Sequence, residues 1–260
     1  MTTLISWNVN GARAAYKNGF MDWLAATNAD IVCLQEVRAE PQQLPDDLRH
    51  PAGYHAFWNP SRSKKGYSGT ALLTRTAPRT VELGLGVEAF DVEGRTIVAE
   101  YDDFVLLNSY FPNGGRDHGR VPYKLAFYDA FLVTCETLRR RGKPVIFCGD
   151  VNTAHQPIDL ARPRENVGVT GFLPEERAWL DAVVDAGYVD TFRHLYPDLP
   201  GQYTWWNQVT AARQRNVGWR IDYFFVSPDL VPRMVEAFIT PEVLGSDHCP
   251  VGLVLRSSEA

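Results

Sequence analysis

This chain of 260 residues has few cysteines, no long apolar run and no excess of positive charge. Its 4 cysteines stand singly, without the spacing of a zinc site, which favours buried free thiols in a reducing compartment over a disulfide framework. No apolar run approaches membrane-spanning length, and the N-terminus lacks the basic start and apolar core of a signal peptide. We therefore expect a cytoplasmic protein without membrane contact.

The net charge limits the choice of partners. The chain has 26 basic and 31 acidic residues, a formal charge of −5. This excludes a protein coated in positive charge for non-specific nucleic-acid binding, but it is compatible with a local basic groove. The composition is that of an ordinary soluble globular protein, and no linker or composition break divides it, so we expect one domain over residues 1–260.

A short apolar segment at 145–148 predicts a buried strand that ends in polar residues. Pro144 precedes it, Gly149 ends it, and Asp150 and Asn152 follow two residues apart. In an extended segment residues at this spacing point to the same side. The alternative is a turn in which the pair caps the next segment, and taken alone the stretch favours a functional site only slightly.

The same pattern recurs along the chain. Strands are expected at 3–9, 30–36, 104–110 and 220–226, and residues 245–250 lead into a last strand at 251–255, whereas the clearest helices are expected at 18–26, 121–141 and 174–186. Strands of one sheet end at common edges, so their polar residues can converge into an oxygen-rich cluster that suits Mg²⁺ or Mn²⁺ rather than zinc. These polar residues are Asn8, Asn10, Glu36, Tyr110, Asp150, Asn152, Asp222, Asp247 and His248.

Asp222 lies inside an otherwise apolar run. A carboxylate there is costly to bury unless it is paired. A hydrogen bond to His248 would satisfy Asp222 and would fix the tautomer of the imidazole. The long irregular segment at 153–173 is a further functional candidate, because structureless loops of this length in compact domains are often functional.

Six motifs, in this order, resemble the exonuclease III family of apurinic/apyrimidinic endonucleases. The resemblance covers almost the whole chain and implies a DNase I-like four-layer α/β sandwich, in which two packed mixed β-sheets are flanked by helices. It also implies a monomeric Mg²⁺-dependent DNA-repair phosphodiesterase that cuts double-stranded DNA 5′ to abasic sites, with some 3′→5′ exonuclease activity, working at the nucleoid in a prokaryote. The motifs are Ser6-Trp7-Asn8-Val9-Asn10-Gly11, Leu34-Gln35-Glu36, Tyr110-Phe111-Pro112-Asn113, Gly149-Asp150-Val151-Asn152, Trp219-Arg220-Ile221-Asp222-Tyr223 and Ser246-Asp247-His248-Cys249-Pro250-Val251.

By that resemblance Glu36 is the principal ligand of Mg²⁺, for which Mn²⁺ can substitute. Asn8, Asn10 and Asp247 lie in or near the metal shell, as do Asp150, Asn152 and His248. Many relatives have Asp where this chain has Asn10, so the amide removes one negative charge. The number of metal ions stays open.

The resemblance also assigns catalytic roles. Asp150 orients or deprotonates the attacking water, or protonates the leaving oxygen, and the sequence does not choose between these. Asn152 positions the water and the phosphate. His248, held by Asp222, contacts the scissile phosphate or acts as base, and Tyr110 stabilises the developing charge.

Contacts with DNA are assigned to two groups of residues. Asn113 binds phosphate, and five basic residues are candidates for neutralising the backbone, although each is equally well explained as solvated surface: Lys64, Lys65, Arg116, Arg162 and Arg213. Trp205, Trp219 and Ile221 match family positions that line a small apolar pocket for a flipped-out, baseless sugar. Trp206 is better explained as core.

Two alternatives remain. The same fold hosts phosphodiesterases that act on RNA, inositol phosphate or lipid headgroups, and the chain could instead be a non-catalytic DNA-binding module. Interleaved arginine and tryptophan between 205 and 220 favour nucleic acid over a lipid headgroup. A module without catalysis would normally have lost some of the acids, all of which are present.

Overall fold

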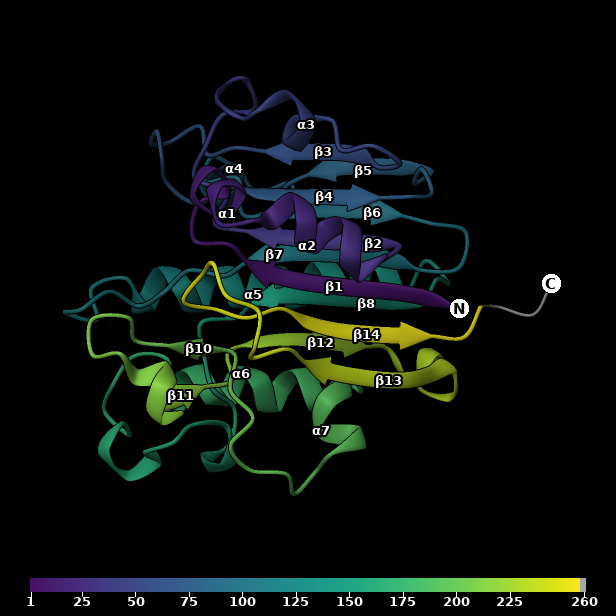
Figure 1. The fold of residues 1–260 in the computed structure, drawn as a ribbon. Coiled ribbons are helices and arrows are strands. Elements are labelled where there is room, and N and C mark those ends of the chain that lie inside the picture. Colours follow the sequence, from purple (N-terminus) through teal and green to yellow (C-terminus); the bar gives the residue numbers. More distant parts are fainter. Residues whose placement is uncertain (258–260) are drawn as a thin grey trace.

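Two six-stranded mixed sheets pack face to face, and helices cover their outer faces (Figure 1). The computed structural model describes residues 1–257. It confirms the expected four-layer α/β sandwich. No helix in this part of the chain is both long and apolar enough to cross a bilayer.

The first sheet has the order β13-β14-β1-β2-β4-β3, with β1 and β2 parallel and the other neighbours antiparallel. Its outer face packs on α1 (Ala12–Lys17), α2 (Phe20–Thr27) and α3 (Asp46–Arg49) through a core that includes Trp7 and Leu24. Its strands are β1 (Thr2–Asn8), β2 (Ile31–Gln35), β3 (His55–Asn59), β4 (Thr70–Thr74), β13 (Met234–Ile239) and β14 (Val251–Leu255).

The second sheet has the order β5-β6-β7-β8-β12-β9, in which only β7 and β8 are parallel. The helices α5 (Val121–Arg139) and α6 (Pro174–Asp185) pack on its outer face through Phe131, Trp179 and their neighbours. Its strands are β5 (Thr80–Leu83), β6 (Thr96–Glu100), β7 (Val105–Tyr110), β8 (Val145–Asp150), β9 (Val189–Asp190) and β12 (Asp222–Val226).

Shorter elements complete the chain. A two-stranded ribbon of β10 (Trp205–Trp206) and β11 (Gly218–Trp219) stands at the end of the sandwich toward which β1 runs (Figure 1). The remaining elements are α4 (Glu88–Asp91), α7 (Thr191–Leu195) and five 3₁₀ turns, η1 (Pro41–Gln43), η2 (Pro157–Asp159), η3 (Pro163–Glu165), η4 (Ala212–Arg215) and η5 (Pro228–Arg233).

The layer between the two sheets changes from apolar to polar along the strands, and this change positions the site. Successive residues of a strand alternate between faces. On the face of β8 turned to the other sheet, Ile146 and Cys148 lie in the shared core, and Asp150 ends the series. On β1 the corresponding series runs from Leu4 through Ser6 to Asn8. Oxygen- and nitrogen-bearing side chains therefore gather between the sheets at one end.

Three features differ from the expectations. The helix expected at 18–26 is α2, which begins at Phe20 because Gly19 takes a left-handed conformation with φ 89°, and the short helix α1 before it was not predicted. The edge strand β13 was not predicted, since only one of its six residues is buried and it lacks clear alternation. The helix α7 was missed because five residues are too few to show helical periodicity.

Candidate active site

A pocket of about 310 Å³ opens at the polar end of the layer between the sheets. The predicted site residues that line it come from segments far apart in the sequence: Glu36, Tyr110, Asn113, Asp150, Asn152, Trp205, Trp219, Ile221, Asp247 and His248. Asn8, Asn10 and Asp222 lie directly behind this lining, in hydrogen-bond contact with Glu36, Asp247 and His248 respectively. The structure thus brings together all nine polar residues predicted to converge.

Asn8 is the link between two carboxylates. Its Nδ2 donates to Glu36 Oε2 at 3.0 Å and to Asp150 Oδ2 at 2.9 Å, while its Oδ1 accepts from the backbone N–H of Asn10 at 3.0 Å. One of the two lone pairs of the carbonyl oxygen is therefore in use. These contacts support a role for Asn8 in holding Glu36 and Asp150.

Three of the polar residues have a left-handed backbone, which strand alternation does not anticipate. The φ angles are 48° at Asn10, 53° at Glu36 and 57° at Asn152. Non-glycine residues adopt this region at a cost, and such positions cluster at functional sites. Asn152 reaches Asp150 because the chain turns, with its N–H donating to Asp150 Oδ1 at 2.8 Å and its Nδ2 donating to Phe111 O at 2.9 Å. Our argument from strand alternation was wrong for this pair.

His248 lies between two buried carboxylates. Its Nδ1 is 2.8 Å from Asp222 Oδ2, and its Nε2 is 3.8 Å from Asp150 Oδ2. Burial opposes the charge on His248, but Asp222 and Asp150 outweigh it and raise the pKa of His248 to about 10. Burial, together with the charges of Asp222 and Glu36, raises the pKa of Asp150 to about 7, although His248 opposes this shift. A carboxyl group with a pKa near neutrality can take up or release a proton at physiological pH.

Tyr110 reaches the same pocket as a neutral hydroxyl. Burial and the nearby charges of Glu36 and Asp150 raise its pKa well above the ordinary tyrosine value. The guanidinium of Arg95 lies 4.9 Å from the centre of the Tyr110 ring and donates from Nη1 to the Tyr110 carbonyl at 2.8 Å, which holds the residue in place. At neutral pH the phenol can therefore donate a hydrogen bond into the pocket.

The donor set fits a hard divalent cation. Asp150, Asp222 and His248 each offer one ligand atom, all within 4.8 Å of one another, and Glu36 and Asp247 add carboxylates to the pocket. Asp222 Oδ1 is buried and has no hydrogen-bond partner within residues 1–257. Oxygen-rich sites with one imidazole suit Mg²⁺ or Mn²⁺ better than a soft metal. The group could therefore hold a metal ion.

Arg38 is a pocket residue that the sequence analysis missed. It donates from Nε and Nη2 to Glu36 Oε1, with the Nη2 contact at 2.5 Å. Burial opposes its charge, but Glu36, Tyr110 and Asp247 raise the pKa of the guanidinium above its ordinary value. The sequence carried one signal, since Arg38 follows Glu36 at the same spacing that separates Asp150 from Asn152.

An apolar wall lines the same pocket as the carboxylates. Trp205 and Trp219 are paired residues of the β10–β11 ribbon, with ring centroids 6.3 Å apart, and both pack on Ile221. Trp205 Nε1 donates to Asp247 Oδ2 at 3.1 Å, so the wall is tied to the polar side. Trp206, as expected, is buried in a separate core cluster.

The basic residues assigned to DNA fall into two groups. Lys64, Lys65, Arg116 and Arg162 are exposed on loops, and Arg162 pairs with Glu165 at 3.4 Å. The guanidinium of Arg213 instead donates to the carbonyls of Ser246, Pro241 and Val243 at 2.7–3.0 Å and lies over the Trp206 ring. These partners favour a structural role for Arg213, which ties the η4 turn to the segment before Asp247.

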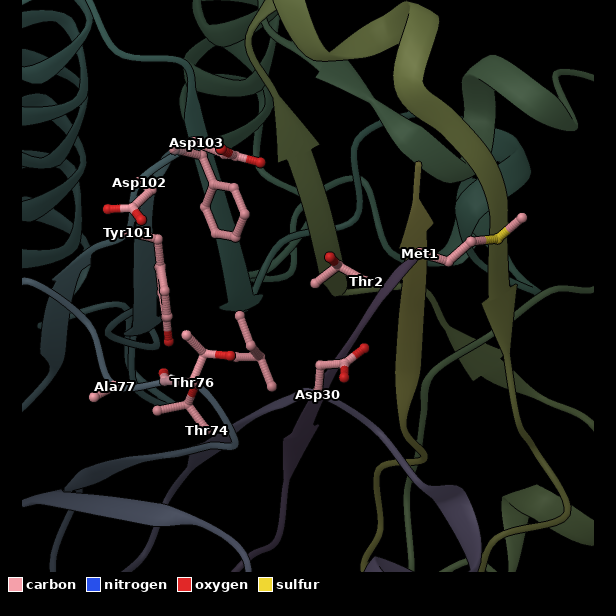
Figure 2. A pocket seen from close by; sticks show the side chains of 11 residues that line it. Met1, Thr2, Asp30, Thr74, Thr76, Ala77, Tyr101, Asp102 and Asp103 are labelled. Atoms are coloured by element: carbon pink, nitrogen blue, oxygen red, sulfur yellow. Dashed lines mark hydrogen bonds between the residues drawn. The ribbon is translucent and has the colours of Figure 1, made fainter. Parts of the chain in front are cut away.

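A second hollow, of about 390 Å³, lies at the opposite end of the sandwich, beside the start of β1 (Figure 2). Its acids have other partners: Asp102 pairs with Arg79, and Asp30 accepts from the backbone N–H of Thr3 at 2.7 Å. Its lining includes no histidine and no tryptophan. The predicted site residues line the pocket at the other end of the sandwich.

Comparisons with known proteins agree with this geometry. An exodeoxyribonuclease of Bacillus subtilis (strain 168) is 46% identical over 254 residues, which cover 97% of this chain and 99% of that protein. The DNA repair nuclease APEX1 of Danio rerio is 43% identical over 253 residues, or 97% of this chain and 81% of the relative. The crystal structure of the AP endonuclease LMAP from Leishmania major has a TM-score of 0.90 at 29% identity, covering 98% of this chain and 88% of that one. The sequence profile of one family matches residues 5–248. The predicted resemblance is confirmed, and the chain belongs to the Endonuclease/Exonuclease/phosphatase family.

Proposed function

We propose that this protein is a Mg²⁺-dependent DNA-repair phosphodiesterase that cuts the backbone 5′ to abasic sites and leaves a 3′-hydroxyl. Mn²⁺ is expected to substitute, and a 3′→5′ exonuclease activity on duplex DNA is expected alongside. The observation that carries the proposal is a single pocket with a His–Asp pair and convergent carboxylates on one side and a tryptophan wall on the other. The names of the relatives, an exodeoxyribonuclease and a DNA repair nuclease, support the same substrate.

When bound, the metal would supply positive charge near the phosphoryl group, which lowers the cost of the negative charge that develops there. Glu36, held by Asn8 and Arg38, is its principal expected ligand, with Asp247 nearby. The amide of Asn10 donates to Asp247 Oδ1 at 2.7 Å. A carboxylate at position 10 would instead repel the carboxylate of Asp247. This arrangement supports a site with fewer negative charges than that of relatives with Asp at this position.

The chain's own groups move the proton and hold the phosphate. Asn152 Nδ2 donates to Asp150 Oδ2 at 3.2 Å, which supports a pair that orients the attacking water beside the phosphate. The pKa of Asp150, about 7, suits a group that accepts the proton of that water. The imidazolium of His248 and the neutral phenol of Tyr110 are donors for the phosphate oxygens, which is the preorganised stabilisation that phosphoryl transfer requires.

Exclusion of an attached base is the proposed origin of abasic-site selectivity. The wall of Trp205, Trp219 and Ile221 offers apolar surface to a flipped-out sugar, and extrusion costs least where no base pair must be broken. Lys64, Lys65 and Arg116 are the proposed contacts for flanking phosphates, because they are exposed on loops. All nine polar residues of the site converge within one chain, and we propose that the protein acts as a monomer.

The test is a cleavage assay with an end-labelled duplex that carries a single abasic analogue, beside an undamaged duplex of the same sequence. We expect one incision 5′ to the analogue in Mg²⁺, none in EDTA, and slow shortening of the undamaged duplex from its 3′ ends. Cleavage of RNA or an inositol phosphate without incision of the abasic duplex would overturn the proposal. Binding of the duplex without any cleavage would support the non-catalytic alternative.

A further inference from the structure

A completely buried ion pair lies between the two helices on the outer face of the second sheet. Lys124 of α5 and Glu176 of α6 both have 0% of their side chains exposed, and Lys124 Nζ is 2.8 Å from Glu176 Oε1. Removing two charges from water costs about as much as their attraction returns, so such a pair is weak evidence of a role in stability. Its other hydrogen bonds point to a different role.

The lysine side of the pair holds the backbone of a proposed catalytic residue. Lys124 Nζ donates to the carbonyl of Asn152 at 2.7 Å and to Thr153 Oγ1 at 2.8 Å. Asn152 has the left-handed φ of 57°, and its carbonyl also accepts from Thr153 Oγ1 at 2.9 Å. Lys124 bonds both the carbonyl and that hydroxyl, and it is not among the residues that line the pocket.

The glutamate side holds part of the pocket wall. Glu176 Oε1 accepts from Thr170 Oγ1 at 2.6 Å, and Oε2 accepts from the N–H groups of Gly171, at 2.5 Å, and Leu173, at 3.1 Å. Thr170 and Gly171 both line the pocket. Every acceptor position of the buried carboxylate is therefore used on this segment or on Lys124.

Gly171 lies close to both Trp219 and the carbonyl oxygen of Asn152. A Cβ at this position would lie 3.1 Å from the Trp219 ring and 3.2 Å from the carbonyl oxygen of Asn152, and its φ is +94°. The segment held by Glu176 thus touches both the tryptophan wall and the residue held by Lys124. The Lys124–Glu176 ion pair therefore connects Asn152 with the wall segment at residues 170–173.

We propose that Lys124 and Glu176 are positioning residues that fix the distance between Asn152 and the pocket wall formed by residues 169–171 against Trp219. The inference rests on the proposed function, since the pocket is the one assigned to the abasic sugar. Loss of the pair displaces Asn152 and loosens the wall, but leaves the exposed basic residues free to bind DNA. Catalysis and selectivity therefore fall more than affinity does.

The main test is the double substitution Lys124→Met with Glu176→Gln, which leaves neither charge buried alone. The new amide carbonyl can still accept from the N–H groups of Gly171 and Leu173, so the segment keeps its backbone partners. We expect kcat on the abasic duplex to fall by about a hundredfold, the usual effect of a misplacement near 1 Å. KM should stay within about twofold, because uniform binding is not changed.

Two further variants complete the design. Lys124→Arg keeps the charge and the donors and should recover most of kcat relative to the double variant. The control is Arg139→Met with Glu136→Gln, which removes a partly exposed pair on the same helix α5, with its 3.1 Å contact away from the pocket, and should leave kcat and KM unchanged.

A folded double variant with wild-type kcat overturns the inference, while cleavage by the wild type in the same assay keeps the proposed function intact. If the double variant melts below the assay temperature, Thr170→Val decides instead. It removes only the hydroxyl bonded to Glu176, and the ratio of abasic to undamaged cleavage should fall. An unchanged ratio would equally refute the proposed role. If the wild type itself fails to cut, the proposed function fails first.

Discussion

Asp222 and His248 form a buried pair in which Asp222 Oδ2 lies 2.8 Å from His248 Nδ1. The same carboxylate oxygen accepts from Thr204 Oγ1 at 2.6 Å, so its position is fixed from the far side as well. The pair turns the other imidazole nitrogen, Nε2, toward Asp150 and the pocket. Two residues 26 positions apart in sequence thus fix the orientation of one imidazole in the pocket.

The pair predicts strongly non-additive effects of mutation. Groups that act as one unit lose most of their effect when the first is removed. Asp222→Asn and His248→Ala should each reduce kcat/KM on an abasic duplex, and the double variant should be little worse than His248→Ala alone. Steady-state kinetics of the four proteins measure this. A double variant whose loss equals the product of the single losses would show that the two residues act separately.

Asp150→Asn and Glu36→Gln should each abolish cleavage and leave the fold intact. Both carboxylates serve the pocket, and each replacement keeps the shape of the side chain and part of its hydrogen bonding. Cleavage in Mg²⁺ and thermal melting of each variant are the measurements. More than a few per cent of wild-type activity in Asp150→Asn would rule out the role assigned to Asp150.

The stability of the metal-free protein should fall as the pH rises. The pKa of Asp150 is raised in the fold, from 3.8 to about 7, and that of His248 from 6.5 to about 10. A folded pKa above the unfolded value stabilises the protein at low pH, and the contribution is lost as the pH passes through the folded pKa. The loss of stability caused by Asp150 is complete near its folded pKa of about 7, and it should be absent in Asp150→Asn. Melting curves in EDTA compare the two proteins between pH 5 and about 10. Parallel curves would contradict the assignment.

Asn10→Asp should increase the dependence of folding on the metal. The amide of Asn10 now donates to Asp247 Oδ1 at 2.7 Å, and a carboxylate there would face another carboxylate. The variant should melt at a lower temperature than the wild type in EDTA and gain more on addition of Mg²⁺, because the cation relieves the repulsion. An equal gain for both proteins would show that position 10 lies outside the influence of the metal.

Most of the central strands and the polar residues at their ends could be predicted from local patterns. Short apolar strands with polar ends are visible in the sequence, and the rule that strand ends share an edge brings those residues together. The roles and the sandwich itself came from the ordered motifs. The backbone at Glu36 and Asn152 could not be foreseen, because the left-handed turn at each depends on neighbours from other segments.

Charge alone was a poor guide to surface function. From the sequence, Arg213 and Arg116 had the same standing as candidates for binding DNA. In the structure, however, the guanidinium of Arg213 donates to three backbone carbonyls that only the tertiary fold brings near it. Lys124 is the opposite case. In the sequence it resembles an ordinary helix lysine, but in the structure its side chain is completely buried. Partners of long cationic side chains are set by tertiary packing, which periodicity does not encode.

Trp219→Ala should cost selectivity more than chemistry. Trp219 packs edge-on against Trp205, at 83°, and against Phe172, at 81°, and with Ile221 it forms an apolar part of the pocket lining. Removing the ring opens space for a base, so discrimination between abasic and undamaged nucleotides should fall by about 1–3 kcal/mol, the usual worth of shape in an apolar pocket. Cleavage of both substrates by both proteins is compared at one salt concentration, because salt alone changes affinity for DNA. If both substrates slow by the same factor, Trp219 supports the fold or general DNA binding, and the wall is not the source of selectivity.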